Sequence, residues 1–254
     1  MPEQVLFLLV AAFFAGLIDA MGGGGGLIQV PALFSSMGQT APAMLFGSNK
    51  LASIWGTGAA AYNYARRVKL EWNTALPATI AALVFAFCGA YTVTWLPGNL
   101  VRKLLPIVLF ILLIYTWRSS QLGLSHAPLH RGTRERLLAI VVGAAIGFYD
   151  GFFGPGTGSF LIFLFVRFFG FDFLRASAVS KVVNVACNLA ALIWFGYSGN
   201  VLWQLGLSMA VFNVCGSLLG TRLALRHGSH LVRKVFLVVV GALILKTAYD
   251  AFLR

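Results

Sequence analysis

The stretch Ile18-Asp-Ala-Met-Gly-Gly-Gly-Gly-Gly-Leu27 places an acidic residue and five consecutive glycines inside a long apolar segment, residues 5–35. A membrane-spanning helix needs about 20 apolar residues, so this segment is too long for one crossing and too short for two full ones. Non-helical backbone at membrane depth is tolerated only where protein or a watery cavity satisfies its polar groups. The stretch therefore predicts a re-entrant hairpin of two half-helices that meet at a polar cavity.

The composition of the whole chain is that of a polytopic helical membrane protein. Of its 254 residues, 59% are hydrophobic and only 10% are charged, whereas soluble domains carry about 25% charged residues. The net charge of +12 arises from basic residues in short loops between apolar stretches, which favours cytoplasmic loops over a nucleic-acid partner. We therefore predict an all-α membrane protein in contact with the lipid bilayer.

The chain contains an internal repeat. A shift of 131 residues aligns several polar and glycine positions without a gap, and polar matches are rare in such a composition. We predict a first transmembrane repeat over residues 1–117, a basic cytoplasmic linker over 118–136 and a second repeat over 137–254. The aligned pairs include Asp19 with Asp150, Lys50 with Lys181, Trp72 with Trp203, Gly23 with Gly154, and Gly89 with Gly220.

Each repeat contains four apolar segments, of which the first is interrupted by glycine. The later three have lengths near that of a spanning helix. Each unit is therefore expected to form one broken hairpin and three spanning helices. The segments are 5–35, 43–65, 74–96 and 100–117 in the first unit, and 137–169, 176–195, 201–222 and 235–252 in the second.

The distribution of Lys and Arg between loops predicts the topology. If the broken segment crosses once, the loop Lys and Arg residues divide equally between the two sides; if it returns to its starting side, thirteen face one side and three the other. The positive-inside rule selects the hairpin. Three crossings per unit would insert the two units upside down relative to each other, as in many secondary transporters. Both termini would then lie outside the cytoplasm.

Four ionisable residues lie inside predicted membrane segments and form two repeat-related pairs, Asp19 with Asp150 and Lys50 with Lys181. A charged side chain at a helix centre costs about 2.5–3.5 kcal/mol on insertion scales, so these residues need compensation. Pairing of each aspartate with a lysine supplies it most simply. Such pairs serve either to bind a ligand or only to fix the register of the helices.

The residues around the lysines and the glycine breaks predict an anion-binding site. A half-helix that begins at Gly25 or Gly26 directs free N–H groups and a positive dipole into the cavity. Lys50, Ser53 and Thr57 share one helix face, and Lys181, Asn184 and Asn188 repeat this spacing, although hydrogen bonding between helices also explains such polar residues. The predicted substrate-binding residues are Gly23, Gly24, Gly25, Asn49, Lys50, Gly154, Gly156, Thr157, Ser180, Lys181, Asn184 and Asn188.

Other kinds of site have little support in the sequence. There is no phosphate-loop motif and no dinucleotide fingerprint in a strand–turn–helix context. We expect no metal, because metal-ligand spacings are missing. We also expect no cofactor and no catalytic residue. The histidines lie in cationic loops and are predicted to be solvated; they are His126, His130, His227 and His230.

These motifs resemble those of a known family. The segment Ala15-Gly-Leu-Ile-Asp-Ala-Met-Gly-Gly-Gly-Gly-Gly-Leu-Ile-Gln-Val-Pro31, followed by Asn49-Lys50, is similar to the first signature of the TauE/SafE sulfite exporter family, also called the 4-toluenesulfonate uptake permease family. Gly147-Phe-Tyr-Asp-Gly-Phe-Phe-Gly-Pro-Gly-Thr-Gly-Ser159, followed by Ser180-Lys181, resembles the second. The resemblance implies a bacterial inner-membrane carrier for sulfite, sulfonates or related organosulfur anions.

We therefore expect an ion-coupled secondary transporter for a small anion, working by alternating access, in which Asp19 or Asp150 carries the coupling ion, a proton. A passive anion channel is an alternative that shares the same pocket. An intramembrane aspartyl-type enzyme is a weaker one, because Asp19 follows Leu17-Ile18 rather than the Gly-x-Gly that such enzymes need. The oligomeric state stays open, with a homo-oligomer as one alternative.

Overall fold

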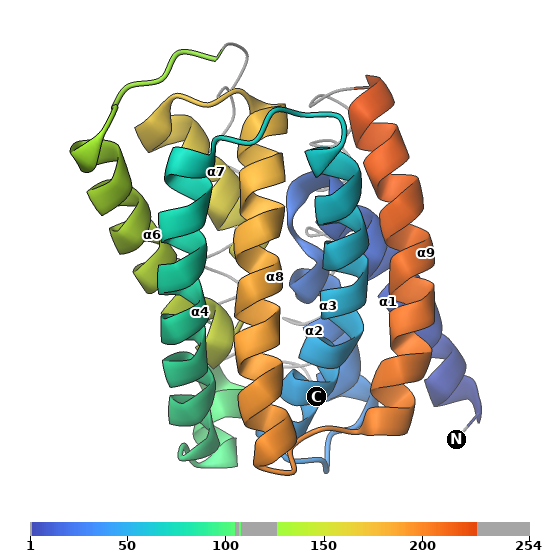
Figure 1. Cartoon of the computed structure of the whole chain (residues 1–254). Coiled ribbons are helices and arrows are strands. Elements are labelled where there is room, and N and C mark those ends of the chain that lie inside the picture. Colours follow the sequence, from blue (N-terminus) through green and yellow to red (C-terminus); the bar gives the residue numbers. More distant parts are fainter. Residues whose placement is uncertain (1, 105–106, 108–125, 228–254) are drawn as a thin grey trace.

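The computed structural model describes residues 2–104, 107 and 126–227, and every regular element in this part of the chain is an α-helix (Figure 1). Four of these helices, α1, α4, α8 and α9, are long and apolar enough to cross a membrane. The predicted all-helical membrane class is confirmed in this form. The helices are α1 (Pro2–Gly22), α2 (Gly25–Ser36), α3 (Pro42–Ala65), α4 (Trp72–Thr94), α6 (Thr133–Phe152), α7 (Thr157–Phe169), α8 (Phe173–Tyr197) and α9 (Trp203–His227).

The second and third apolar segments of each unit form helices close to their predicted bounds. Residues 43–65 and 74–96 correspond to α3 and α4, and 176–195 and 201–222 correspond to α8 and α9. Local signals explain two of the starts: Pro42 occupies the first turn of α3, and the Asp172 carboxylate caps α8 by accepting a bond from the Arg175 N–H. The predicted segment 235–252 and most of 100–117 lie outside the described residues.

The first segment of each unit is broken where the glycines predict, but its two arms are unequal. α1 has 21 residues and α2 has 12, while α6 has 20 and α7 has 13. Gly23 and Gly154, 131 positions apart, take the left-handed backbone angles φ 79° and 87°, which side chains other than glycine disfavour. At about 1.5 Å per residue, α1 alone is long enough to span a bilayer. The expectation of two short half-helices therefore holds only for the second arm of each hairpin.

The two broken segments begin and end at opposite ends of the molecule, although their tips meet. In Figure 1, the chain enters α1 and leaves α2 near the lower end, whereas it enters α6 and leaves α7 near the upper end. The later helices also alternate: α3 ascends and α4 descends, while α8 descends and α9 ascends. Helices that correspond in the repeat therefore run in opposite directions.

The two units are interlocked rather than side by side. α1 packs against α9, and α6 packs against α4, so the first helix of each unit lies on a helix of the other. A Cβ atom on Gly89 of α4 would lie 2.2 Å from the Phe148 carbonyl oxygen, and one on Gly220 of α9 would lie 2.3 Å from the Leu17 carbonyl oxygen. Gly89 and Gly220 are repeat equivalents, as are Leu17 and Phe148. The two interfaces thus use the same close backbone approach, which small residues permit.

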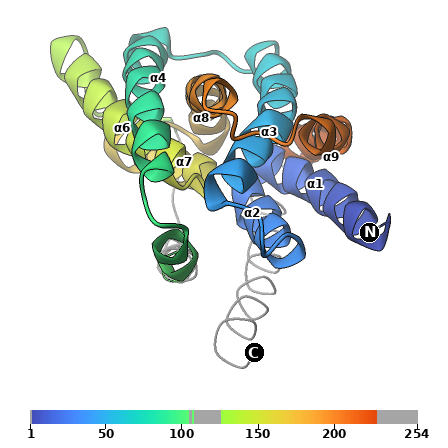
Figure 2. The same cartoon turned by 90° about the horizontal axis from the view of Figure 1, so that it is seen from below.

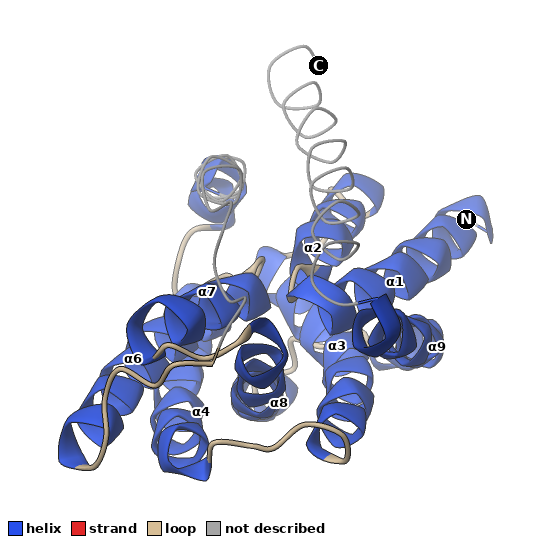
Figure 3. Cartoon of the chain, turned by 90° about the horizontal axis from the view of Figure 1, so that it is seen from above, coloured by secondary structure: helices blue, strands red, loops and turns tan. Residues whose placement is uncertain are grey.

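Helices α3 and α8 occupy the middle of the molecule. In the views from below and above, α4 and α6 lie on one side of them and α1 and α9 on the other (Figures 2 and 3). One apolar core forms among α1, α2 and α3, and a second among α7, α8 and the alanines of α4. Large apolar side chains remain exposed on the outer helices, for example Ile80 and Val211. This distribution suits a protein whose outer face contacts lipid.

The loops differ in charge between the two ends. Loops 66–71 and 126–132 and the last turns of α9, which together contain six Lys and Arg residues, lie near the upper end of Figure 1, while loops 37–41 and 198–202, which contain none, lie near the lower end. The predicted linker ends earlier than expected, because α6 begins at Thr133 rather than after residue 136. Glu135 explains this extension: it is buried and accepts a 2.5 Å hydrogen bond from the Thr74 hydroxyl of α4.

Candidate functional site

The four charged residues that the sequence predicts within the membrane form two ion pairs, and each pair joins the two units. Lys50 of α3 donates to the Asp150 carboxylate of α6. Lys181 of α8 lies 2.9 Å from the Asp19 carboxylate of α1 and also donates to the Asp19 backbone carbonyl. The pairing of each aspartate with a lysine, expected from the insertion cost, is confirmed. The pairs are repeat equivalents, since both lysines and both aspartates are 131 positions apart.

The broken helices position the two aspartates. Asp19 lies one turn before the end of α1, and Asp150 lies just before the end of α6. At such ends the last carbonyl groups lack partners within the helix, which suits a neighbouring ammonium group. The lysines come from the two central helices, so each pair links a hairpin of one unit to the middle helix of the other.

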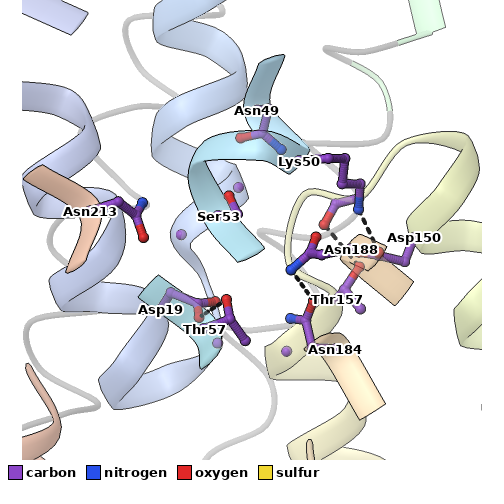
Figure 4. Close-up of a pocket in the computed structure, with 15 residues that line it drawn as sticks. Asp19, Asn49, Lys50, Ser53, Thr57, Asp150, Thr157, Asn184, Asn188 and Asn213 are labelled. Carbon is purple, nitrogen blue, oxygen red and sulfur yellow. Dashed lines mark hydrogen bonds and ion pairs between the residues drawn. The ribbon is translucent and has the colours of Figure 1, made fainter. Parts of the chain in front are cut away.

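A polar cavity lies between the two pairs (Figure 4). The volume that the centre of a water molecule can occupy there is about 20 Å³. This is room for little more than one water molecule. The cavity is therefore too small for a larger solute in this conformation. Its lining is almost entirely polar or glycine and consists of Asp19, Gly23, Gly25, Gly26, Asn49, Lys50, Ser53, Thr57, Asp150, Gly154, Thr157, Gly158, Asn184, Asn188 and Asn213.

Helix α3 supplies one wall through the face predicted from its spacing. Lys50, Ser53 and Thr57 all line the cavity, and the Thr57 hydroxyl donates to the Asp19 carboxylate at 3.1 Å. Asn49 lies beside them, with its side-chain oxygen buried and lacking a hydrogen-bond partner. This wall therefore offers both donors and an unsatisfied acceptor.

Helix α8 supplies the opposite wall. Asn184 and Asn188 point into the cavity, and the Asn188 amide donates to the Asn184 side-chain oxygen at 3.1 Å (Figure 4). Together with Asn49, they place three amide groups around a small volume. Amides both donate and accept hydrogen bonds, so they solvate a polar solute of either charge.

The tips of the two hairpins meet at the floor of the site. Ser159 of α7 donates from its backbone N–H to the Gly23 carbonyl at 3.2 Å and from its hydroxyl to the Gly22 carbonyl at 2.7 Å. A Cβ atom on Gly23 would lie 2.2 Å from the Gly158 carbonyl carbon, so the tips touch backbone to backbone. The first residues of α2 and α7, Gly25 and Thr157, line the cavity. The predicted placement of two helix N-termini at one site is thus present in the structure.

Four residues of the predicted set do not line the cavity. Lys181 is fully buried against Asp19, and Ser180 is fully buried beside it with a hydroxyl that lacks a hydrogen-bond partner. Gly24 and Gly156 serve as the N-caps of α2 and α7 instead. The other predicted residues are all in the lining, as are both aspartates.

Asn213 of α9 is a lining residue with a polar side chain that the sequence did not point to. Its amide donates to the Gln29 side-chain oxygen at 2.9 Å and to the Ala12 carbonyl at 3.2 Å. Gln29 of α2 is fully buried, and its amide nitrogen has no hydrogen-bond partner. Asn213 corresponds to Ala82 in the first unit, so a search for repeated polar residues passes over it. The available signal was an amide residue inside an apolar segment.

The expectation that the histidines are solvated is wrong for His126. Its ring is only 21% exposed and lies 3.7 Å from both the Glu71 and Asp172 carboxylates. Arg175 bridges the same two acids, at 3.2 and 3.3 Å. The cluster forms because the linker packs between loop 66–71 and the start of α8. Among the described residues, no group of three His, Cys, Asp or Glu residues could hold a metal ion.

The known proteins to which this chain is similar are membrane transporters by name. A family model described as "Sulfite exporter TauE/SafE" matches residues 8–247. A "Probable membrane transporter protein ORF9" from Sinorhizobium sp. is 35% identical over 96% of this chain and 92% of its own length. "Probable membrane transporter protein YfcA" from Escherichia coli K12 is 32% identical over 98% of this chain and 91% of its own length. A "Probable membrane transporter protein" from Haemophilus influenzae is 31% identical over 98% of this chain. No solved structure matches.

Proposed function

Because this chain belongs to the sulfite exporter TauE/SafE family of membrane transporters, we propose that it is a secondary transporter for a small oxyanion such as sulfite or a sulfonate. The observation that carries the proposal is the small polar cavity between two ion pairs, each of which joins the two units. Ion pairs that only fixed helix register would not need a cavity lined by amides and glycine backbone.

The chemistry of the lining supports an oxyanion as the substrate. Lys50 supplies a cation, Thr57 and the amides of Asn49, Asn184 and Asn188 supply neutral donors, and the starts of α2 and α7 add helix dipoles. A tetrahedral or pyramidal oxyanion has several acceptor oxygens and needs donors from several directions. The lining comes from both units and meets this need.

The arrangement of the helices supports insertion of the two units in opposite senses. The basic loops 66–71 and 126–132 and the last turns of α9, which contain Arg222 and Arg226, share one end (Figure 1), which we assign to the cytoplasm. The hairpins of α1 with α2 and of α6 with α7 would then re-enter from outside and inside, respectively. The protein would reside in the inner membrane of a bacterium, with both termini outside the cytoplasm.

The small size of the cavity supports transport by alternating access. A space of about 20 Å³ does not admit an oxyanion, so the cavity must widen before the substrate binds. Each ion pair crosses between units, and movement of one unit against the other would therefore expose the site alternately to the two sides.

The aspartyl-enzyme alternative requires two carboxyl groups that share a proton. Asp19 and Asp150 are instead each bonded to a lysine. This arrangement favours transport over hydrolysis.

Flux into proteoliposomes tests the proposed function. Uptake of labelled sulfite, 4-toluenesulfonate and a carboxylate would be measured with and without a pH gradient. We expect saturable uptake of the sulfur oxyanions, with competition between them and little uptake of the carboxylate. Uptake that rises linearly with concentration would indicate a channel, and uptake no faster than in protein-free liposomes would refute the proposal.

A further inference from the structure

The charges that surround the cavity balance. The charged residues in its lining are Asp19, Asp150 and Lys50 in the part of the chain that the structure describes, and Lys181, which lies behind Asp19, completes the second of two ion pairs. An anion that entered this site would add an uncompensated buried charge, which is strongly unfavourable. Binding of an anion therefore requires a second event that restores neutrality.

Protonation of an aspartate is the simplest such event. A protonated carboxyl group releases its lysine, and the ammonium group then pairs with the anion instead. The protonated group also changes from an acceptor to an O–H donor, so it can donate to an anion oxygen. The proton would add one positive charge to the site, and one bound monovalent anion would add one negative charge. The net charge of the site would therefore stay at zero.

The two ion pairs differ in whether an anion in the cavity can reach the lysine and replace its aspartate. Lys50 lines the cavity, and its ammonium group lies 3.0 Å from the position of a Cβ atom on Gly154 at the hairpin tip. Lys181 does not line the cavity, and it donates to the Asp19 backbone carbonyl as well as to the carboxylate. Protonation of Asp19 would leave Lys181 bonded to that carbonyl. The pair that an anion can open is thus Lys50 with Asp150.

Few ionisable groups face Asp150 apart from Lys50. Cys187 of α8 interacts with it electrostatically, and Tyr149, its neighbour on α6, donates its hydroxyl to the Pro155 carbonyl at 2.6 Å. Helix α4, which packs along α6, contains no charged residue. The remaining charged groups on the packed elements are Asp19 and Lys181 across the cavity and, toward the basic end, Arg134, Glu135, Arg136, Arg167 and Arg175.

From this arrangement we infer that Asp150 takes up one proton for each negative charge that Lys50 receives from the substrate, so that transport is electroneutral. The inference rests on the proposed function and specifies its coupling. A gradient of one pH unit would then support about tenfold accumulation of a monovalent anion. The membrane potential would support none, whereas one uncompensated charge would give about a 50-fold effect at 100 mV.

The test uses 4-toluenesulfonate, a strong-acid anion that carries no proton of its own across the working pH range. Proteoliposomes of the full chain would be given either a pH gradient or a potential set by potassium and valinomycin. We expect accumulation with the pH gradient and none with the potential alone. Accumulation driven by the potential would overturn the inference and leave the proposed function standing, whereas no saturable uptake under either condition would refute both.

Two variants assign the proton to a residue. Asp150→Asn imitates the protonated group, so it should still bind 4-toluenesulfonate but take up no proton on binding, as measured by calorimetry in buffers of different ionisation enthalpy. Lys69→Met, which removes an exposed loop cation away from the cavity, should still take up one proton per anion. Proton uptake that persists in Asp150→Asn, or that disappears in Lys69→Met, would contradict the assignment to Asp150.

Discussion

Lys50 and Asp150 lie 100 positions apart in the chain and yet form a buried ion pair between the middle helix of one unit and the hairpin of the other. Its repeat equivalent, Lys181 with Asp19, joins the units in the reverse sense. The two pairs therefore tie the halves of the protein together at the place where a substrate would bind. Opening one pair would weaken that connection, which links occupancy of the site to movement of the units.

Removal of one partner from the first pair should destabilise the protein more than removal of both. Lys50→Met leaves Asp150 buried without a partner, at a cost of about 3–5 kcal/mol. The double variant Lys50→Met with Asp150→Asn contains no buried charge at this position and should recover most of that loss. Unfolding of the purified variants in detergent measures the difference, and a double variant less stable than Lys50→Met would contradict the pairing.

Gly154→Ala should impair the site rather than only the fold. Gly154 has φ 87°, and an added Cβ atom would lie 3.0 Å from the Lys50 ammonium nitrogen. We expect strain of about 1 kcal/mol or more from the backbone, together with at least a tenfold loss of anion affinity. The matched control is Gly199→Ala, where φ is 72° and a Cβ atom would meet nothing within 4 Å. Equal affinities in the two variants would show that Gly154 does not border the binding site.

The close contact of α1 with α9 should not tolerate a larger residue than glycine. A Cβ atom on Gly220 would lie 2.3 Å from the Leu17 carbonyl oxygen, which is backbone and cannot rotate away. Gly220→Ala is therefore expected to destabilise the protein by about 1–3 kcal/mol. Gly58→Ala in α3 meets nothing within 4 Å, so it should be neutral or stabilise by up to about 1 kcal/mol through helix propensity. Thermal unfolding of both variants in detergent checks the contrast.

The proposed inversion predicts opposite accessibility at two equivalent positions. Lys69 and Asn200 are 131 residues apart. They belong to loops 66–71 and 198–202, which lie at opposite ends of the molecule (Figure 1). In a cysteine-free background, a membrane-impermeant maleimide should label Lys69→Cys only from the cytoplasmic side and Asn200→Cys only from the other side. Labelling of both from the same side would exclude the inverted arrangement.

Much of the fold could be predicted from the sequence. A membrane-spanning helix is recognised by an apolar segment of about 20 residues, without any need for helix periodicity. The bounds of α3 and α4 were predicted to within two residues. The Asp–Lys pairing could also be predicted, since a buried charge in lipid requires a partner. Which lysine joins which aspartate could not, because that depends on how the two units interlock.

The parts of the site that escaped prediction are those that depend on packing. Lys181 and Lys50 are equivalent in the sequence, yet only Lys50 lines the cavity, because Lys181 lies against the last turn of α1. Asn213 has no polar equivalent in the first unit, so the repeat gave no reason to select it. His126 follows a long polar stretch, and only the contact between the linker and α8 explains its partial burial.

The central claim is that the cavity beside Lys50 binds the anion, and binding of labelled 4-toluenesulfonate to purified protein tests it most directly. The informative variant is Lys50→Met with Asp150→Asn, which removes the cation of the cavity without leaving a buried charge. Lys69→Met, which removes an exposed loop cation, is the control. We predict that the control binds like the unmodified protein and that the double variant shows no saturable binding. Saturable binding of equal affinity in the double variant would contradict the account.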